Sequence, residues 1–281
     1  MLRREQLLGA NFSFQHYPFR WVVEQLHKMG FERMELWGIA PHLDLFHDNR
    51  SRLMELKSIL DDNGLRVHCF TPEQVLYPIN IASGDRAYRE ASVERFMRAA
   101  DMSAELGARY VFLTPGRGFE SDSREVALAH SVESIGRIAS HAGSLGVACL
   151  LEPLQRLESN IVNNADDLLG LWRDIGADNV DIVLDLVAMA TAGDTVGGYV
   201  ERFGKNLAHV HIVDGTPAGH LVWGDGNLPL HDYVAELAAS SFAGTMTFEP
   251  FGNGSYALDP VSAWQRSMDA IGRHLDHAKQ P

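Results

Sequence analysis

The stretch Glu105-Leu106-Gly107-Ala108-Arg109-Tyr110-Val111-Phe112-Leu113 places a glycine between the end of an amphipathic segment and a short apolar run. A glycine at a helix C-terminus accepts the left-handed conformation that ends the helix, and an apolar run directly after it suits a buried parallel strand. The same arrangement recurs along the chain, at Gly30, Gly64, Gly107, Gly146, Gly176 and Gly204. Successive glycines lie roughly 30 to 40 residues apart, which is about the length of one strand–helix unit in a barrel.

The apolar runs predict eight strands that alternate with helices. We expect the strands near residues 7–13, 32–37, 66–70, 109–113, 147–152, 181–185, 207–213 and 245–249. The longest helices are expected near 85–106 and 122–144, and Asn164 and Pro260 have the residue types that begin a helix. No Pro-, Gly- or Ser-rich linker divides the 281 residues, so we expect one domain, residues 1–281. The pattern favours an α/β fold, a single (β/α)8 TIM barrel, over a doubly wound parallel sheet.

The composition is that of a soluble globular chain, with 46% hydrophobic and 22% charged residues. The formal net charge of −13 repels nucleic-acid phosphates and anionic lipid headgroups. Cys69 and Cys149 lie in apolar runs and are expected to be buried, reduced thiols. The chain shows no signal-peptide core and no apolar run of about 20 residues. We therefore expect a cytoplasmic protein with neither nucleic acid nor membrane as a partner. We also expect it to be a homo-oligomer.

The ends of the fifth to eighth predicted strands each carry a side chain that can bind a metal ion: Glu152, Asp185, His211 and Glu249. In a barrel of this kind the active site lies at the C-terminal ends of the strands. Three carboxylates that converge there without a partner would repel one another and lose hydration, so a bound cation is the natural remedy. The pattern predicts a metal site.

Each of these residues also has a plainer interpretation. A single acidic residue at a strand end is commonly solvated or caps the next helix, and His209 or His211 could be a hydrogen-bonded core histidine. Taken together, the four favour a metal site. Because the set has no thiolate, it is harder than a structural zinc site and favours Mn²⁺, with Mg²⁺, Co²⁺ or catalytic Zn²⁺ as alternatives. We expect His209 to point inward, below the metal layer, outside the ligand set.

Several short segments, spread over nearly the whole chain, carry a resemblance to a known family. They are Glu35-Leu36-Trp37-Gly38 with Pro41-His42; Thr71-Pro72-Glu73 with Tyr77-Pro78-Ile79-Asn80 and Gly84-Asp85; Leu151-Glu152-Pro153-Leu154 with Glu158-Ser159-Asn160; His209-Val210-His211-Ile212-Val213-Asp214; and Gly224-Asp225-Gly226-Asn227-Leu228-Pro229. In these segments the sequence resembles the xylose-isomerase-like TIM barrel superfamily of sugar isomerases and epimerases, and within it the ketose 3-epimerase branch. The resemblance is greatest to the fructoselysine 3-epimerases.

The resemblance implies an isomerase, a divalent-metal-dependent carbohydrate epimerase. It implies the same metal ligands, Glu152, Asp185, His211 and Glu249, and it places Glu152 and Glu249 on opposite faces of the reacting carbon. One glutamate would remove a proton next to a ketone, through a cis-enediolate, and the other would return a proton to the opposite face. Such a carbon acid is too weak for a free carboxylate near pH 7, so metal coordination must stabilise the developing oxyanion by several kcal/mol.

The resemblance also suggests substrate contacts. Glu158 matches a position that binds a substrate hydroxyl, although an exposed loop acid is an equal alternative. His220 lies where sugar epimerases carry an arginine, while Trp37 and His42 follow the second predicted strand and could face a sugar, although tryptophan is more commonly a core residue. Ala188 stands where hexulose epimerases have a histidine, which favours a substituted ketose over a free hexulose.

The expected partner is a small-molecule carbohydrate without a phosphate, because residues 206–265 contain no Lys or Arg. The glycine-rich turn Gly116-Arg117-Gly118 is a weak phosphate signal. Three alternatives remain: an aldose–ketose, inosose or hydroxypyruvate isomerase with the same carboxylates; an endonuclease IV-like hydrolase, which the acidic charge disfavours; and a sugar-binding protein that has lost catalysis. The last would not need two opposed bases.

Overall fold

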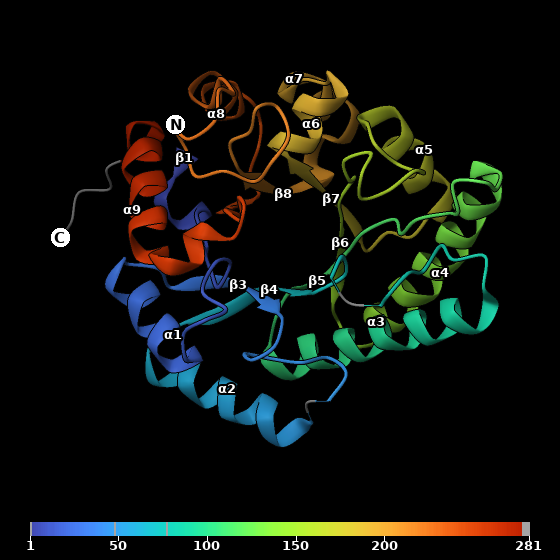
Figure 1. The fold of residues 1–281 in the computed structure, drawn as a ribbon, viewed down its shortest axis with the longest axis horizontal. Coiled ribbons are helices and arrows are strands. Elements are labelled where there is room, and N and C mark those ends of the chain that lie inside the picture. Colours follow the sequence, from blue (N-terminus) through green and yellow to red (C-terminus); the bar gives the residue numbers. More distant parts are fainter. Residues whose placement is uncertain (1, 48, 77, 277–281) are drawn as a thin grey trace.

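The computed structural model describes residues 2–47, 49–76 and 78–276, and a ring of eight parallel strands lies at its centre (Figure 1). In the order of the ring, the strands are β2 (Gly9–Ala10), β3 (Arg33–Gly38), β4 (Arg66–Pro72), β5 (Tyr110–Leu113), β6 (Ala148–Leu151), β7 (Val180–Asp185), β8 (Leu207–Ile212) and β9 (Thr245–Phe248). A parallel bridge between Leu7 and Met246 joins the first strand to the last. The ring is therefore a (β/α)8 barrel, as predicted.

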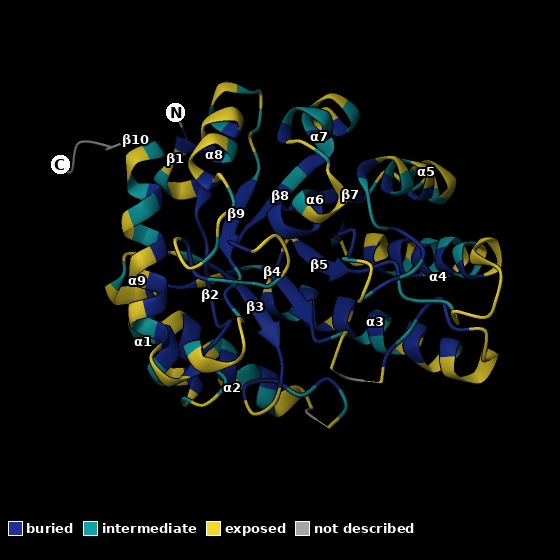
Figure 2. Ribbon diagram, turned by 45° about the horizontal axis from the view of Figure 1, so that its top comes forward, coloured by how far each residue is buried: buried dark blue, intermediate teal, exposed yellow. Residues whose placement is uncertain are grey.

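The helices lie outside this ring and connect successive strands (Figure 1). They are α1 (Phe19–Lys28), α2 (Arg50–Asp62), α3 (Arg86–Leu106), α4 (Arg124–Ser144), α5 (Ala165–Ile175), α6 (Leu186–Ala192), α7 (Val196–Phe203), α8 (Leu230–Ala239) and α9 (Pro260–Ile271). Figure 2 shows buried strands and helices whose outer sides are exposed. A further parallel pair, β1 (Leu2–Arg3) with β10 (Leu275–Asp276), lies outside the barrel sheet.

The boundaries agree with the signals in the sequence. All six glycines that separate helices from strands have positive φ, between 51° and 80°. At Gly107, φ is 72°, and this left-handed residue ends α3 just before β5. Asn164 caps α5 through the N–H of Asp167, and Pro260 is the first residue of α9. The first strand is shorter than expected, because β2 covers only two residues.

Alternating side chains on each strand fill the barrel interior. Leu150 of β6 and Val183 of β7 belong to a small buried cluster with Cys69, and both cysteines are free and buried, as expected. Since successive residues of a strand face opposite sides, the residues two positions further on, Glu152 and Asp185, face the same way at the C-terminal end of the barrel. The polar residues therefore stand directly above an apolar layer.

Two register shifts interrupt the regular ladder of strands. His68 of β4 is skipped where Met34 pairs with Val67 and Glu35 pairs with Cys69. Ala208 of β8 is skipped in the same way, next to His209. Such bulges re-aim the side chains that follow them, and they are common beside active sites.

In the part of the chain that the structure describes, no helix has the length and apolar character needed to cross a membrane. Tyr77, which belongs to one of the segments that carry the family resemblance, lies outside the described residues.

Candidate active site

Four side chains from consecutive strands converge at the C-terminal end of the barrel. Glu152 directly follows β6, Asp185 is the last residue of β7, His211 lies in β8, and Glu249 directly follows β9. Each can offer one ligand atom, and these atoms all lie within 4.8 Å of one another. The pairing of β7 with β8 sets Asp185 beside His211, which explains why residues far apart in the sequence meet here.

The centre of this group is His211 Nδ1, which lies 2.9 Å from Oε1 of Glu152 and 3.2 Å from Oε2 of Glu249. Despite these short distances, Glu152 Oε1, Asp185 Oδ2 and His211 Nδ1 are buried and have no hydrogen-bond partner. Buried polar atoms without partners are rare in folded proteins and call for an explanation such as an ion. Three carboxylates and one imidazole, with no thiolate, fit a divalent cation of intermediate hardness.

The pKa shifts of these side chains also favour a bound cation. Burial raises the pKa of Glu152 well above its usual range, and it raises that of Asp185, although neighbouring histidines oppose both shifts. Burial alone would lower the pKa of His211, but Glu249, Glu35 and Glu152 outweigh it and raise that pKa well above its usual value. These groups therefore hold protons strongly at this site. A divalent cation would displace those protons and relieve the repulsion between the carboxylates.

A cavity of about 490 Å³ opens above the group. Glu152, Asp185 and Glu249 line it, while His211 is fully buried beneath. The aromatic and apolar part of its wall contains Phe12, Trp37, Phe112, Phe251 and Ala188. Among the described residues that line this cavity, none is a lysine or arginine. The cavity thus combines apolar walls with a strongly acidic floor.

Three of the four predicted substrate contacts line this cavity: Trp37, Glu158 and His220. The indole N–H of Trp37 donates to Oε2 of Glu73 at 2.9 Å, so one edge of the ring is held by hydrogen bonding. His220 Nε2 lies 3.4 Å from Oε2 of Glu249. Glu158 accepts from the backbone N–H of Gln155 at 3.1 Å, and burial raises its pKa.

The fourth predicted contact, His42, does not line the cavity. It is buried, with Nδ1 3.0 Å from the amide nitrogen of Asn11 and Nε2 2.8 Å from the carbonyl oxygen of Tyr17. Both ring nitrogens therefore have partners in the protein, and burial lowers the pKa of the ring. His42 therefore connects the loop that follows β3 to the loop that contains Asn11 and Tyr17.

Two residues that were not predicted from the sequence, Gln15 and Glu35, also have surroundings that suggest a role. Gln15 lines the cavity, and its Oε1 atom is buried without a hydrogen-bond partner, so it can accept from a substrate hydroxyl. Glu35 is fully buried beneath the site and contacts the ring of His211. The available signal for Glu35 was a charge within the apolar run Met34-Glu35-Leu36-Trp37, which is expensive unless it is paired.

Comparisons with known proteins agree with the barrel fold. A family model described as xylose isomerase-like TIM barrel matches residues 23–274. The fructoselysine 3-epimerase of Escherichia coli O157:H7 is 26% identical over 237 residues, which cover 84% of this chain and 86% of that protein. The D-psicose 3-epimerase of Agrobacterium fabrum is 27% identical over 251 residues, or 86% of this chain and 83% of that protein. The crystal structure of a 3-keto-D-glucoside 4-epimerase from E. coli has a TM-score of 0.80 at 20% identity, covering 95% of this chain and 99% of that one, and shares the fold.

Proposed function

Because the chain belongs to the xylose isomerase-like TIM barrel family, we propose that it is a sugar epimerase that depends on a divalent metal ion. The ligands would be Glu152, Asp185, His211 and Glu249, the four side chains whose ligand atoms converge. The observation that carries the proposal is a pair of glutamates whose carboxylate oxygens lie 2.9 Å and 3.2 Å from one histidine nitrogen. Two neighbouring carboxylates at one site suit a reaction in which one base removes a proton from a carbon and a second acid returns one.

The chemistry starts with a ketose whose ketone group lies above the acidic floor. One glutamate, Glu152 or Glu249, takes the proton from the carbon next to the ketone, and the electron pair left behind forms a cis-enediolate. The other glutamate, which is protonated at the start of the turnover, delivers its proton to the opposite face, which inverts the carbon and regenerates the ketone. Proton exchange with solvent then returns both carboxyl groups to their starting state. When bound, the cation supplies Lewis-acid stabilisation of the negative charge that develops on oxygen.

The metal is proposed to be Mn²⁺, since three carboxylates and one imidazole match its preference for oxygen and nitrogen donors. Mg²⁺, Co²⁺ and Zn²⁺ remain alternatives for the same donors. His220 would bind a substrate hydroxyl next to Glu249, while Glu158 and Trp37 would bind the sugar from the cavity walls.

The substrate is proposed to be a ketose with an N-linked or otherwise extended group on C1. Ala188 lines the cavity and gives room without a hydrogen-bonding side chain. The absence of lysine and arginine among the described lining residues disfavours a sugar phosphate, whereas Glu73 and Glu158 would tolerate a substrate ammonium group. Fructoselysine, a glycated lysine, has both features.

The test is incubation with a panel of ketoses and fructosamines in D₂O with Mn²⁺. An epimerase inverts the carbon next to the ketone and labels that carbon with deuterium, while the product remains a ketose. An aldose–ketose isomerase would instead form an aldose and exchange protons between two adjacent carbons. Glu133→Gln is a suitable control, because Glu133 is an exposed residue of α4 and does not line the cavity. Failure to exchange any carbon-bound proton across the panel would overturn the proposal.

A further inference from the structure

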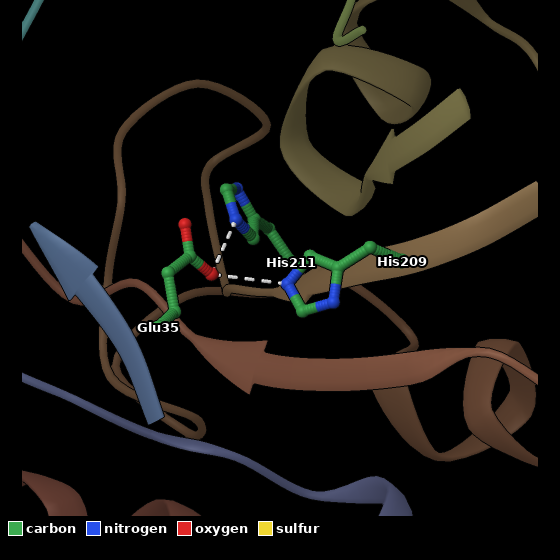
Figure 3. A group of neighbouring side chains, drawn as sticks. All are labelled: Glu35, His209 and His211. Carbon is green, nitrogen blue, oxygen red and sulfur yellow. Dashed lines mark hydrogen bonds and ion pairs between the residues drawn. The ribbon is translucent and has the colours of Figure 1, made fainter. Parts of the chain in front are cut away.

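Beneath the proposed metal site, a buried carboxylate reaches two histidine rings across the barrel. Glu35 lies on β3, whereas His209 and His211 lie on β8, and these two strands are not neighbours in the sheet. All three side chains are fully buried. Figure 3 shows one carboxylate oxygen of Glu35 directed toward both rings. The contact therefore crosses the barrel interior, where an unpaired charge would be very costly.

Both oxygens of Glu35 and both ring nitrogens of His209 have hydrogen-bond partners in the protein. Glu35 Oε2 lies 3.0 Å from Nε2 of His209 and 3.3 Å from Nε2 of His211. Its other oxygen, Oε1, accepts from the hydroxyl of Thr71 at 2.5 Å, and His209 Nδ1 lies 2.7 Å from the hydroxyl of Thr245. Both carboxylate oxygens of Glu35 therefore have protein partners, and the group is a hydrogen-bonded network.

The two nitrogens of His211 consequently have different surroundings. Nε2 faces the Glu35 carboxylate, which can only accept a hydrogen bond and therefore needs N–H at that position. Nδ1 faces Glu152 and Glu249, where it has no hydrogen-bond partner. The ring is also held in its plane by Phe112, which stacks on it at a centroid distance of 5.3 Å and an interplanar angle of 3°.

We propose that Glu35 is a positioning residue for the metal ligand His211. By accepting the Nε2–H of the ring, it fixes that proton on Nε2, so the proton that a cation displaces from His211 is the one on Nδ1, and the Nδ1 lone pair is then directed at the carboxylates of Glu152 and Glu249. Its negative charge raises the electron density of the imidazole, so that Nδ1 binds a cation more strongly. Carboxylates that accept a hydrogen bond from metal-bound histidines have this effect in other proteins. This inference rests on the proposed metal-dependent function and extends it to a residue that does not touch the cation.

The first test measures Mn²⁺ affinity by calorimetry, without any substrate. Glu35→Gln keeps an acceptor oxygen but removes the charge, while Glu35→Met removes both. We expect Mn²⁺ to bind more weakly in the order wild type, Glu35→Gln, Glu35→Met, with a total loss of about 10- to 100-fold, the range for such outer partners. Thr245→Val is the matched control, because it removes a buried hydroxyl from the same network without touching Glu35 or His211, and it should bind Mn²⁺ about as well as wild type.

A double-mutant cycle separates positioning from simple attraction by the charge. If Glu35 acts through His211, then Glu35→Gln should cost much less affinity in a His211→Ala background than in the wild type. Equal losses in both backgrounds would overturn the inference, as would unchanged affinity in both Glu35 variants.

A spectroscopic readout needs neither turnover nor a mutant that folds. In the ¹⁵N-labelled, Zn²⁺-loaded wild type, histidine NMR should show His211 with N–H at Nε2 and no proton on Nδ1. A spectrum with N–H at Nδ1 would overturn the inference even if the protein epimerises sugars. Conversely, failure to epimerise any sugar would remove the proposed reaction but leave this result standing. If no divalent cation binds at all, both proposals fail.

Discussion

The Oδ1 atom of Asp185 accepts a hydrogen bond from the backbone N–H of Ala188 at 2.5 Å, and this bond caps the first turn of α6. The other oxygen, Oδ2, is buried without a hydrogen-bond partner and belongs to the proposed ligand set. One carboxylate therefore begins a helix with one oxygen and offers a ligand with the other. The cap fixes the orientation of the carboxylate in advance, so little side-chain freedom is lost when a cation binds.

This double role gives a selective variant for the metal site. We expect the wild type to bind about one divalent cation per chain. In Asp185→Asn the amide oxygen can still cap α6, since Asn is as good an N-cap as Asp, but the ligand charge is lost. Mn²⁺ affinity should fall by at least ~10-fold, because even outer-shell changes have effects of that size. Elemental analysis measures the number of cations per chain, and calorimetry measures the Mn²⁺ affinity. A cation held by Cys69 or Cys149, or an unchanged affinity, would contradict the assignment.

The two proposed bases predict a strong effect on turnover. Glu152→Gln and Glu249→Gln keep the side-chain shape but remove the group that accepts a proton. Each should lower kcat by at least ~10², the scale for losing a positioned acid or base. Because both residues are also proposed metal ligands, the cation content of each variant must be measured with its rate, at saturating Mn²⁺. Full activity of a metal-loaded Glu152→Gln protein would rule out the two-base mechanism.

Substrate preference follows from the cavity wall. We expect a higher kcat/KM for fructoselysine than for psicose, tagatose or a ketose phosphate. Ala188→His should shift the preference toward free hexuloses, because it adds a hydrogen-bonding ring and fills space beside Asp185. If a free hexulose or a phosphate is the better wild-type substrate by more than ~10-fold, about 1.4 kcal/mol in transition-state binding, the substrate assignment is wrong while the epimerase proposal stands.

His68 predicts how stability depends on pH. Burial, reinforced by His209, Arg33 and Arg109 and opposed by Glu35, lowers the pKa of His68 to about 3. The unfolded chain has a histidine pKa near 6.5, so it takes up this proton first as the pH falls and folding loses stability below that value. Between pH 7 and pH 5 this should cost about 2 kcal/mol, at about 1.4 kcal/mol per pH unit.

Chemical denaturation of the wild type and of His68→Gln at pH 7 and pH 5 measures this contribution. The variant lacks the titrating ring, so its stability should fall less on acidification. An equal fall in both proteins would show that His68 is protonated in the folded state at pH 5.

The fold could be predicted because its signals are local. A glycine such as Gly107 ends a helix through its own backbone conformation, and the apolar run after it needs only burial to become a strand. The convergence of Glu152, Asp185, His211 and Glu249 also needed no distant information, because parallel strands in one barrel end at the same edge. These features depend on short stretches of sequence and on one general rule of barrel geometry.

The remaining features depend on tertiary packing. Glu35 meets His211 only because β3 and β8 face each other across the interior, after bulges at His68 and Ala208 shift the register. His42 follows a strand that leads to the cavity, yet its loop turns the ring inward to Asn11 and Tyr17. Neither outcome is encoded in spacing along the chain, since each needs the position of a partner from another strand or loop.

The hydrogen bond from Trp37 to Glu73 also gives the molecule an optical reporter. In the described part of the chain, Trp37 is the one tryptophan of five that lines the cavity, and its emission depends on the polarity and charge around its indole ring. A sugar that displaces water from this wall would change that emission, whether or not it reacts. Intrinsic fluorescence, compared between the wild type and Trp37→Phe, can therefore detect the binding of a ligand that releases too little heat for calorimetry. It can also detect a ligand that binds without reacting.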